Sequence, residues 1–157
     1  MPGVGLLSEM FVVTEDGKWY RVSLRLMGDS LPVEKIESRL DLAPSTMGRK
    51  GEHLRGDPRL YKHRTNIWVS KYLVNSDVPF EEQIEGFLDV VEPKLGALKE
   101  ILTLPGIKGE LFLGFSSSKS GQGGAIFSPD LLRRVADFGL SLSLDLYPPG
   151  RDENGDE

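Results

Sequence analysis

The chain contains no cysteine among its 157 residues and only two histidines. The lack of cysteine excludes disulfide bonds, thiolate catalysis and cysteine-ligated zinc or iron–sulfur sites. No stretch approaches the roughly 20 apolar residues that a membrane-spanning helix requires. The segment before residue 14 has neither the basic start nor the unbroken apolar centre of a signal peptide. We therefore expect a cytoplasmic protein with no membrane segment.

The chain also has no excess of positive charge, because its formal net charge is −5. Residues 151–157 hold four acids and one base, which gives −3 and leaves −2 on the rest of the chain. This balance argues against a general nucleic-acid binder. The end of the chain is polar and follows two prolines and a glycine. We expect a disordered acidic tail over residues 148–157 and a single α+β domain over residues 1–147.

Five segments have the apolar and polar pattern of β-strands, and they lie at residues 11–14, 19–26, 66–74, 110–115 and 140–146. Asp16 and Gly17 separate the first two and predict a tight hairpin. In the last segment, every second residue from Leu140 to Leu146 is leucine and the residues between are polar. Such alternation indicates a sheet with one buried face and one solvated face.

Apolar residues at helical spacing predict three helices, at about residues 32–41, 79–102 and 128–138. Pro93 interrupts the second pattern and predicts a kink or two abutting helices. Ser128 and Pro129 suit the start of the third helix, and Gly139 suits its end. The order of elements is ββαβαβαβ. We therefore expect an α+β, two-layer sandwich in which three helices cover one face of a largely antiparallel five-stranded sheet.

Several short motifs occur in a distinctive order between residues 20 and 147. They include Val22-Ser23-Leu24-Arg25, Leu42-Ala43-Pro44-Ser45-Thr46, Asn66-Ile67-Trp68, Gly121-Gln122-Gly123-Gly124, Ser128-Pro129-Asp130-Leu131-Leu132 and Leu144-Asp145-Leu146-Tyr147. The order of these motifs resembles that of the bacterial family DUF4279, a domain of unknown function. The resemblance implies one complete α+β domain. It implies no activity, because none is assigned to the family.

A basic loop at residues 49–64 is the first candidate site. Its six cations are Arg49, Lys50, Arg55, Arg59, Lys62 and Arg64, and its two acids are Glu52 and Asp57, so its net charge is +4. Such a loop could bind a phosphate, an acidic protein surface or an RNA backbone. The alternative is a solvated loop that pairs with acids of the protein itself.

Both histidines, His53 and His63, lie in the basic loop, and Trp68 follows it closely. With Asp57 the histidines could form a metal site or an acid–base site, but their spacing matches no recognised metal pattern. We therefore expect no metal and no cofactor. Trp68 could stack on a ligand ring, or it could anchor the core of the sheet.

A glycine-rich loop at residues 114–124 is the second candidate site. It lacks the features of a phosphate-binding P-loop, because Ser118 rather than glycine precedes Lys119 and the next helix begins near Ser128. The exposed amides of Gly121, Gly123 and Gly124 could still bind an anion. The alternative is a flexible or tightly turned connection.

We find no catalytic residue set, since no serine has the surroundings of a nucleophile elbow. The leading hypothesis is a non-catalytic binding module for an acidic protein or an anionic small molecule, and the alternative is an enzyme acting on a phosphorylated or nucleotide substrate. We expect nucleic-acid binding to be the weaker option, and a homodimer is compatible with the sequence. The candidate binding residues are Arg49, Lys50, Arg55, Arg59, His63, Arg64, Trp68, Gly121, Gly123 and Gly124.

Overall fold

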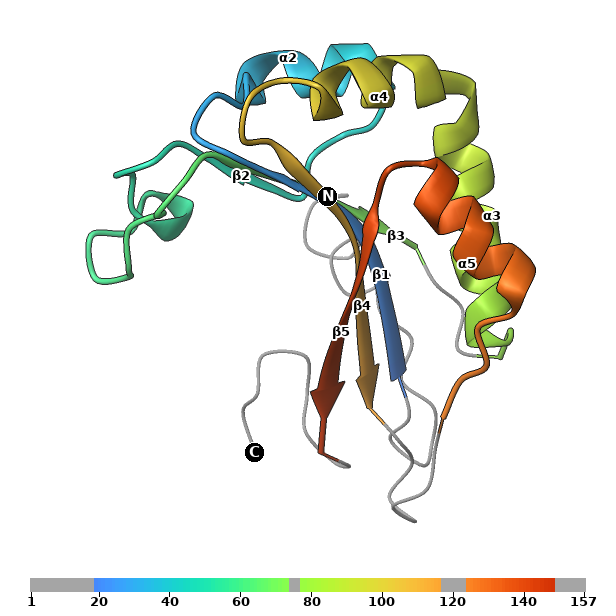
Figure 1. Cartoon of the computed structure of the whole chain (residues 1–157). Helices are drawn as coiled ribbons and strands as arrows, with labels where there is room; N and C mark the ends of the chain where they lie inside the picture. Colours follow the sequence, from blue (N-terminus) through green and yellow to red (C-terminus); the bar gives the residue numbers. More distant parts are fainter. Residues whose placement is uncertain (1–18, 74–76, 117–123, 149–157) are drawn as a thin grey trace, which may run out of the picture.

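The computed structural model describes residues 19–73, 77–116 and 124–148, which form a sheet with helices packed on one face (Figure 1). The strands are β1 (Trp19–Met27), β2 (Thr46–Gly48), β3 (Ile67–Tyr72), β4 (Lys108–Ser116) and β5 (Ser141–Tyr147). The helices are α2 (Val33–Leu40), α3 (Phe80–Val91), α4 (Leu95–Leu102) and α5 (Pro129–Asp137), with short 3-10 turns η1 (Leu54–Gly56) and η2 (Glu92–Lys94). The expected α+β fold is confirmed. The strand expected at 11–14 and the tail from residue 149 onward lie outside the described residues.

The sheet is mixed and mostly antiparallel, with the strand order β2-β3-β1-β4-β5. The central strand, β1, is antiparallel to both β3 and β4, and β2 is antiparallel to β3. The pairing of β4 with β5 is parallel. A parallel pair needs a crossover connection, and α5 lies in the connection between these two strands.

One face of the sheet carries the hydrophobic core. On β1, Val22, Leu24 and Leu26 are fully buried, whereas Arg25 lies on the opposite face and is only partly covered. Residues that are directly opposite on neighbouring strands share a face. The partners of the buried β1 residues on this face are Trp68, Ser70, Tyr72, Gly109, Leu111 and Leu113.

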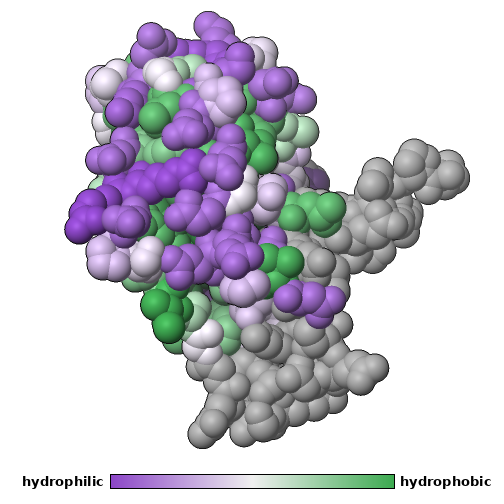
Figure 2. Space-filling model, turned by 90° about the vertical axis from the view of Figure 1, so that its right-hand side faces the viewer, coloured by the Kyte–Doolittle hydropathy of each residue, from purple (hydrophilic) through white to green (hydrophobic). Residues whose placement is uncertain are grey.

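The helices supply the other half of the core. Their buried apolar residues are Val33, Ile36 and Leu40 of α2, Phe80, Ile84, Phe87, Leu88 and Val91 of α3, Leu98 and Ile101 of α4, and Leu131 and Val135 of α5. Pro93 lies in η2, between α3 and α4, where it interrupts the long helix as expected. The side of the molecule that carries α3 and α5 is mostly hydrophilic (Figure 2). Within the described ranges, no helix is long and apolar enough to cross a membrane.

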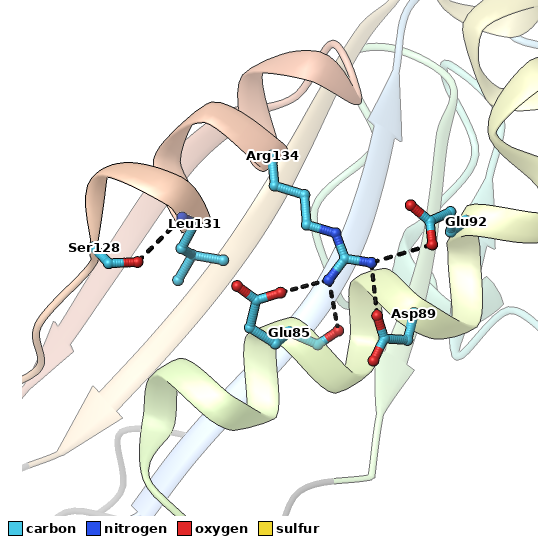
Figure 3. Close-up of polar contacts among 6 residues, drawn as sticks. All are labelled: Glu85, Asp89, Glu92, Ser128, Leu131 and Arg134. Atoms are coloured by element: carbon cyan, nitrogen blue, oxygen red, sulfur yellow. Dashed lines mark hydrogen bonds and ion pairs between the residues drawn. The ribbon is translucent and has the colours of Figure 1, made fainter.

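Helix α5 begins and ends as its sequence predicts. The Ser128 hydroxyl accepts a hydrogen bond from the Leu131 amide at 3.2 Å (Figure 3), and Pro129 occupies the first helical position. After the helix, Gly139 has a φ of 78°, a left-handed conformation that glycine adopts without steric cost. The capping residues therefore set the length of α5, and its apolar stripe sets its orientation.

Arg134 fastens α5 to α3 through a cluster of carboxylates (Figure 3). Its guanidinium donates hydrogen bonds to the carboxylate of Glu85 and, at 2.6 Å, to Asp89, and Glu92 lies at 3.5 Å. The Arg134 side chain is 22% exposed. Burial lowers the pKa of Arg134, but the hydrogen bonds to Asp89 and Glu85 outweigh it, so the pKa is raised above its usual value.

Strand β2 lies within residues 43–65, whose sequence shows no clear apolar periodicity. Thr46, Met47 and Gly48 pair with Val69, Trp68 and Ile67 of β3. Three residues are too few to show an alternation, and Pro44 precedes them. The strand forms because β3 provides a partner edge, which local sequence does not reveal.

Candidate binding site on the basic loop

The basic loop is a closed hairpin that extends beyond the edge of the sheet next to β2 (Figure 1). Its two arms are joined by backbone hydrogen bonds from Leu54 to Tyr61, from His63 to Glu52 and from Gly51 to His63, each 2.9 Å long. The loop is therefore ordered by its own backbone, although its sequence has no periodicity. Its tip is free to face another molecule.

The base of the basic loop is fastened to the end of β1 by Asp29 and Asn66. The Asp29 carboxylate accepts hydrogen bonds from Lys50 at 3.0 Å and from Thr65 at 2.8 Å. The Asn66 side chain accepts from the Lys50 amide at 2.8 Å and donates to the carbonyl oxygen of Leu31 at 3.0 Å. These contacts fix the direction in which the basic loop leaves the sheet.

Half of the cations in the basic loop are paired within the protein. The ion pairs are Arg49 with Glu34 at 2.8 Å, Lys50 with Asp29 at 3.0 Å and Arg59 with Asp57 at 2.8 Å. Arg55, Lys62 and Arg64 are exposed and form no ion pair with any residue in the part of the chain that the structure describes. Arg49 and Lys50 therefore connect the basic loop to other elements, Arg59 pairs within the loop, and the other three cations face solvent without an ion-pair partner among the described residues.

Exposed apolar groups lie beside the solvent-facing cations. Tyr61 is 67% exposed and Leu60 is 38% exposed. Tyr61, Lys62, His63, Arg64, Thr65 and Ile67 line a hollow of about 280 Å³. This volume is at the lower limit of small-molecule pockets, which span roughly 300–1,000 Å³. The geometry is better suited to contact with a protein surface than to enclosure of a ligand.

Both histidines make contacts that belong to the structure of the basic loop and its base. His53 Nδ1 lies 2.8 Å from the carbonyl oxygen of Leu60. His63 is buried, and its ring lies so close to Gly48 that a Cβ on that glycine would be 2.5 Å away from it. Among the residues that the structure describes, no group of three or more histidines and acids could hold a metal ion. His63 thus packs the base of the loop against β2.

Trp68 is part of the core and not of the surface. It is 0% exposed and lies opposite Leu26 in the sheet, on the face that the helices cover. The proposed stacking of a ligand on this ring is wrong for this conformation, because a ligand would have to displace the core. The alternation in β3 correctly separates its two faces but does not indicate which of them is covered.

The described ends of the glycine-rich loop are far from the basic loop. Gly121 and Gly123 lie outside the described residues, and Gly124 is exposed beside the start of α3. Met27 pairs with Ile67 at the end of β1 near the basic loop, whereas Trp19 pairs with Ser116 at the other end. Eight residue steps along β1 separate these ends by about 26 Å. The described residues of the two loops therefore do not line one pocket.

The sequence reasoning missed three contributors to this site. Glu34 and Asp29 pair with the basic loop from distant positions in the chain, and no local pattern indicates such pairs. Tyr61 is not among the candidate residues, although an aromatic residue among arginines is typical of binding surfaces. Its place in the sequence between Arg59 and Lys62 is the feature that indicates it.

The contacts of Asp29 predict that acid loosens the base of the basic loop. Hydrogen bonds from Lys50 and Thr65 hold the pKa of Asp29 below its usual value. A depressed carboxyl pKa stabilises the folded contacts at higher pH, and this stabilisation is lost as the pH falls through the folded pKa. The amide resonances of Lys50 and Thr65 should therefore shift with a midpoint at a lower pH than that of an unperturbed aspartate.

Substitution of Asp29 by asparagine should reproduce this loosening at neutral pH, measured as faster amide hydrogen exchange at Lys50 and Thr65. Asp137→Asn removes an exposed acid at the end of α5 and serves as the control, with no change expected in the basic loop. Equal exchange rates in both variants would show that Asp29 does not hold the loop.

Comparison with known proteins agrees with the family expected from the order of motifs. The profile described as "Domain of unknown function (DUF4279)" matches residues 18–149, which include every described strand and helix. Searches of curated proteins and of solved structures gave no significant match. The matched region also contains the whole basic loop. This chain belongs to the DUF4279 family.

Proposed function

We propose that the protein is a non-catalytic binding module that recognises an acidic protein surface through its basic loop. The observation that supports this most is the set of three exposed cations, Arg55, Lys62 and Arg64, which have no ion-pair partner within the described residues. Cations that are not neutralised internally can attract an acidic partner and set its orientation. We expect the protein to act in the bacterial cytoplasm.

The composition of the surface supports a protein partner over a small anion. Tyrosine and arginine are enriched at the centres of protein interfaces, and Tyr61 lies beside Lys62 on the exposed side of the loop. The hollow next to Tyr61 is small, and the loop extends outward from the sheet. A projecting surface can insert into a groove of a partner, whereas small-molecule ligands usually occupy concave sites.

The alternative function, an enzyme acting on a phosphorylated or nucleotide substrate, has less support. It requires the basic loop and the glycine-rich loop to converge on one pocket. The strand register separates Ser116, where the described part of β4 ends within the glycine-rich loop, from the basic-loop end of β1 by about 26 Å. The binding-module proposal needs only the solvent-facing cations of the basic loop and does not depend on the glycine-rich loop.

Charge reversal tests the proposed function. Replacing Arg55, Lys62 and Arg64 with glutamate should weaken capture of acidic proteins from a lysate of the source organism by ~10-fold or more, because like charges then face each other. The measurement is quantitative mass spectrometry of proteins retained by immobilised wild-type and variant protein. The thermal midpoint of unfolding should not change, since these three side chains have no ion pair to lose in the described structure.

A matched variant carries the same change in net charge elsewhere on the surface, through glutamate at Lys35, Lys94 and Lys99. Capture should be unaffected by it. Equal loss in both variants would reduce the result to a general charge effect, and retention by the basic-loop variant would exclude the proposal. Recovery of RNA that nuclease treatment abolishes would favour nucleic-acid binding instead.

A further inference from the structure

Strand β5 is an edge strand with a single one of the features that usually prevent pairing with another chain, the charge of Asp145. It has seven residues, and among the described residues it pairs with β4 alone. Its register with β4 is continuous from Ser141 to Tyr147, so it contains no bulge, and it contains no lysine, arginine or proline. Edge strands are normally protected by such residues, by bulges or by short length.

The other edge of the sheet is different. Strand β2 has three residues and leads directly into the basic loop. A strand of this length offers few backbone groups to a partner, and the charged loop beside it opposes close packing of two identical edges. Any sheet extension is therefore expected at β5.

The leucines of β5 are only partly covered by the protein. Leu142 packs against the core, whereas Leu144 is 49% exposed and Leu146 is 67% exposed. Leu144 and Leu146 also line a hollow of about 130 Å³ with Phe115 and Phe127. Burial thus decreases along the strand, and its second half presents an apolar strip at an open edge of the described sheet.

We propose that two copies of this chain pair through antiparallel β5 strands centred on Leu144, which joins their sheets into one. In this register Leu144 lies opposite its own copy, and Leu142 lies opposite Leu146. Directly opposite apolar side chains stabilise a strand pair. The two-fold axis runs perpendicular to the sheet, so the helices of both copies cover the same face and the exposed leucines become mutually covered.

The charge pattern of the strand supports a second copy as the partner. Asp145 is the only charged residue of β5, and the proposed register places it opposite Ser143. Its carboxylate accepts a hydrogen bond from the Tyr147 hydroxyl at 2.7 Å, which satisfies one oxygen within the strand. A register centred on Asp145 would oppose two carboxylates, and like charges directly opposite are destabilising. One register therefore pairs all seven residues without repulsion.

This association is independent of the proposed function of the basic loop. Strand β5 and the basic loop lie at opposite edges of the sheet, so pairing through β5 leaves both basic loops accessible at the two ends of the extended sheet. Charge reversal at Arg55, Lys62 and Arg64 should leave the dimer intact. The two proposals can therefore fail separately. A protein that is monomeric would contradict the dimer alone, and a protein that captures no acidic partner would contradict the proposed function alone.

Analytical ultracentrifugation at several protein concentrations tests the dimer. The full chain should sediment with twice its monomer mass, and Leu144→Lys should shift it to the mass of a single chain. Val90→Lys, at an exposed apolar position of α3, is the control and should remain dimeric. A wild-type protein that stays monomeric at its highest soluble concentration overturns the proposal, as does a Leu144→Lys variant that stays dimeric.

The absence of cysteine allows a second test, which does not depend on a disruptive substitution. Leu144→Cys should form an interchain disulfide under mild oxidation, because the residue lies opposite itself across the axis. Leu142→Cys and Leu146→Cys should cross-link when the two variants are mixed, and each should cross-link poorly alone. Cross-linking of Leu142→Cys alone at the rate of Leu144→Cys would exclude the proposed register.

Discussion

Replacing Gly28 with alanine is expected to lower the free energy of unfolding by about 3 kcal/mol or more. Gly28 follows β1 with a φ of +153°, which side-chain-bearing residues rarely adopt. A Cβ there would lie 2.4 Å from Cδ1 of Ile107 and 2.8 Å from the carbonyl oxygen of Gly106. The Ile107 side chain can rotate, but the backbone carbonyl cannot move without shifting the turn before β4. Equilibrium denaturation with urea measures the loss.

Gly96 provides a matched control for Gly28, because it is exposed in α4 and a Cβ at this position would meet no atom within 4 Å. Alanine is a better helix former than glycine, so Gly96→Ala should raise the free energy of unfolding by about 0.5–1 kcal/mol. The two substitutions are chemically identical and should have opposite signs. A small effect at Gly28 would mean that the turn at residues 104–107 adjusts freely.

Replacing Arg134 with methionine should lower the free energy of unfolding by about 2 kcal/mol, a value between those for buried and exposed ion pairs. The substitution keeps an apolar side chain close to Phe138 but leaves Glu85 and Asp89 without their common cation. These carboxylates then repel each other along one side of α3. Urea denaturation at neutral pH measures the loss.

The adjacent residue, Arg133, gives the control for Arg134. Its side chain is 71% exposed and pairs with Asp130 of the same helix, so Arg133→Met should change stability by no more than about 0.5 kcal/mol. Equal losses in the two variants would show that the carboxylates around Arg134 do not contribute to its effect.

The parts of the fold that depend on local patterns could be predicted from the sequence. The alternation of β1 predicts its buried and exposed faces, because successive side chains of a strand point to opposite sides. The same expectation is wrong for β5, where Leu144 and Leu146 are exposed because β5 is at the edge of the described sheet. Pro93 correctly marks the junction of α3 and α4. Ser128 caps α5, because its hydroxyl accepts a hydrogen bond from the amide three residues later. Each of these features depends on residues that are close together in the chain.

The features that could not be predicted depend on pairing between distant segments. Strand β2 exists because β3 offers an edge to it, and the covered side of Trp68 is determined by its pairing with Leu26. The ion pair of Lys50 with Asp29 joins residues on different elements, so the sequence could show the charge of the basic loop but not which cations remain free. The separation of the described ends of the two candidate loops follows from the strand register in the same way.

The central position of β1 has a consequence for synthesis of the protein on the ribosome. Both sheet partners of β1 occur later in the chain, and the hydrogen bond from Ser23 to Phe112 spans 89 positions. The apolar side of β1 therefore emerges long before the segment that completes its pairing. Contacts of such large sequence separation slow folding, and strands that wait for partners are prone to aggregate. The nascent chain is thus a natural client for chaperones until residue 116 has been released.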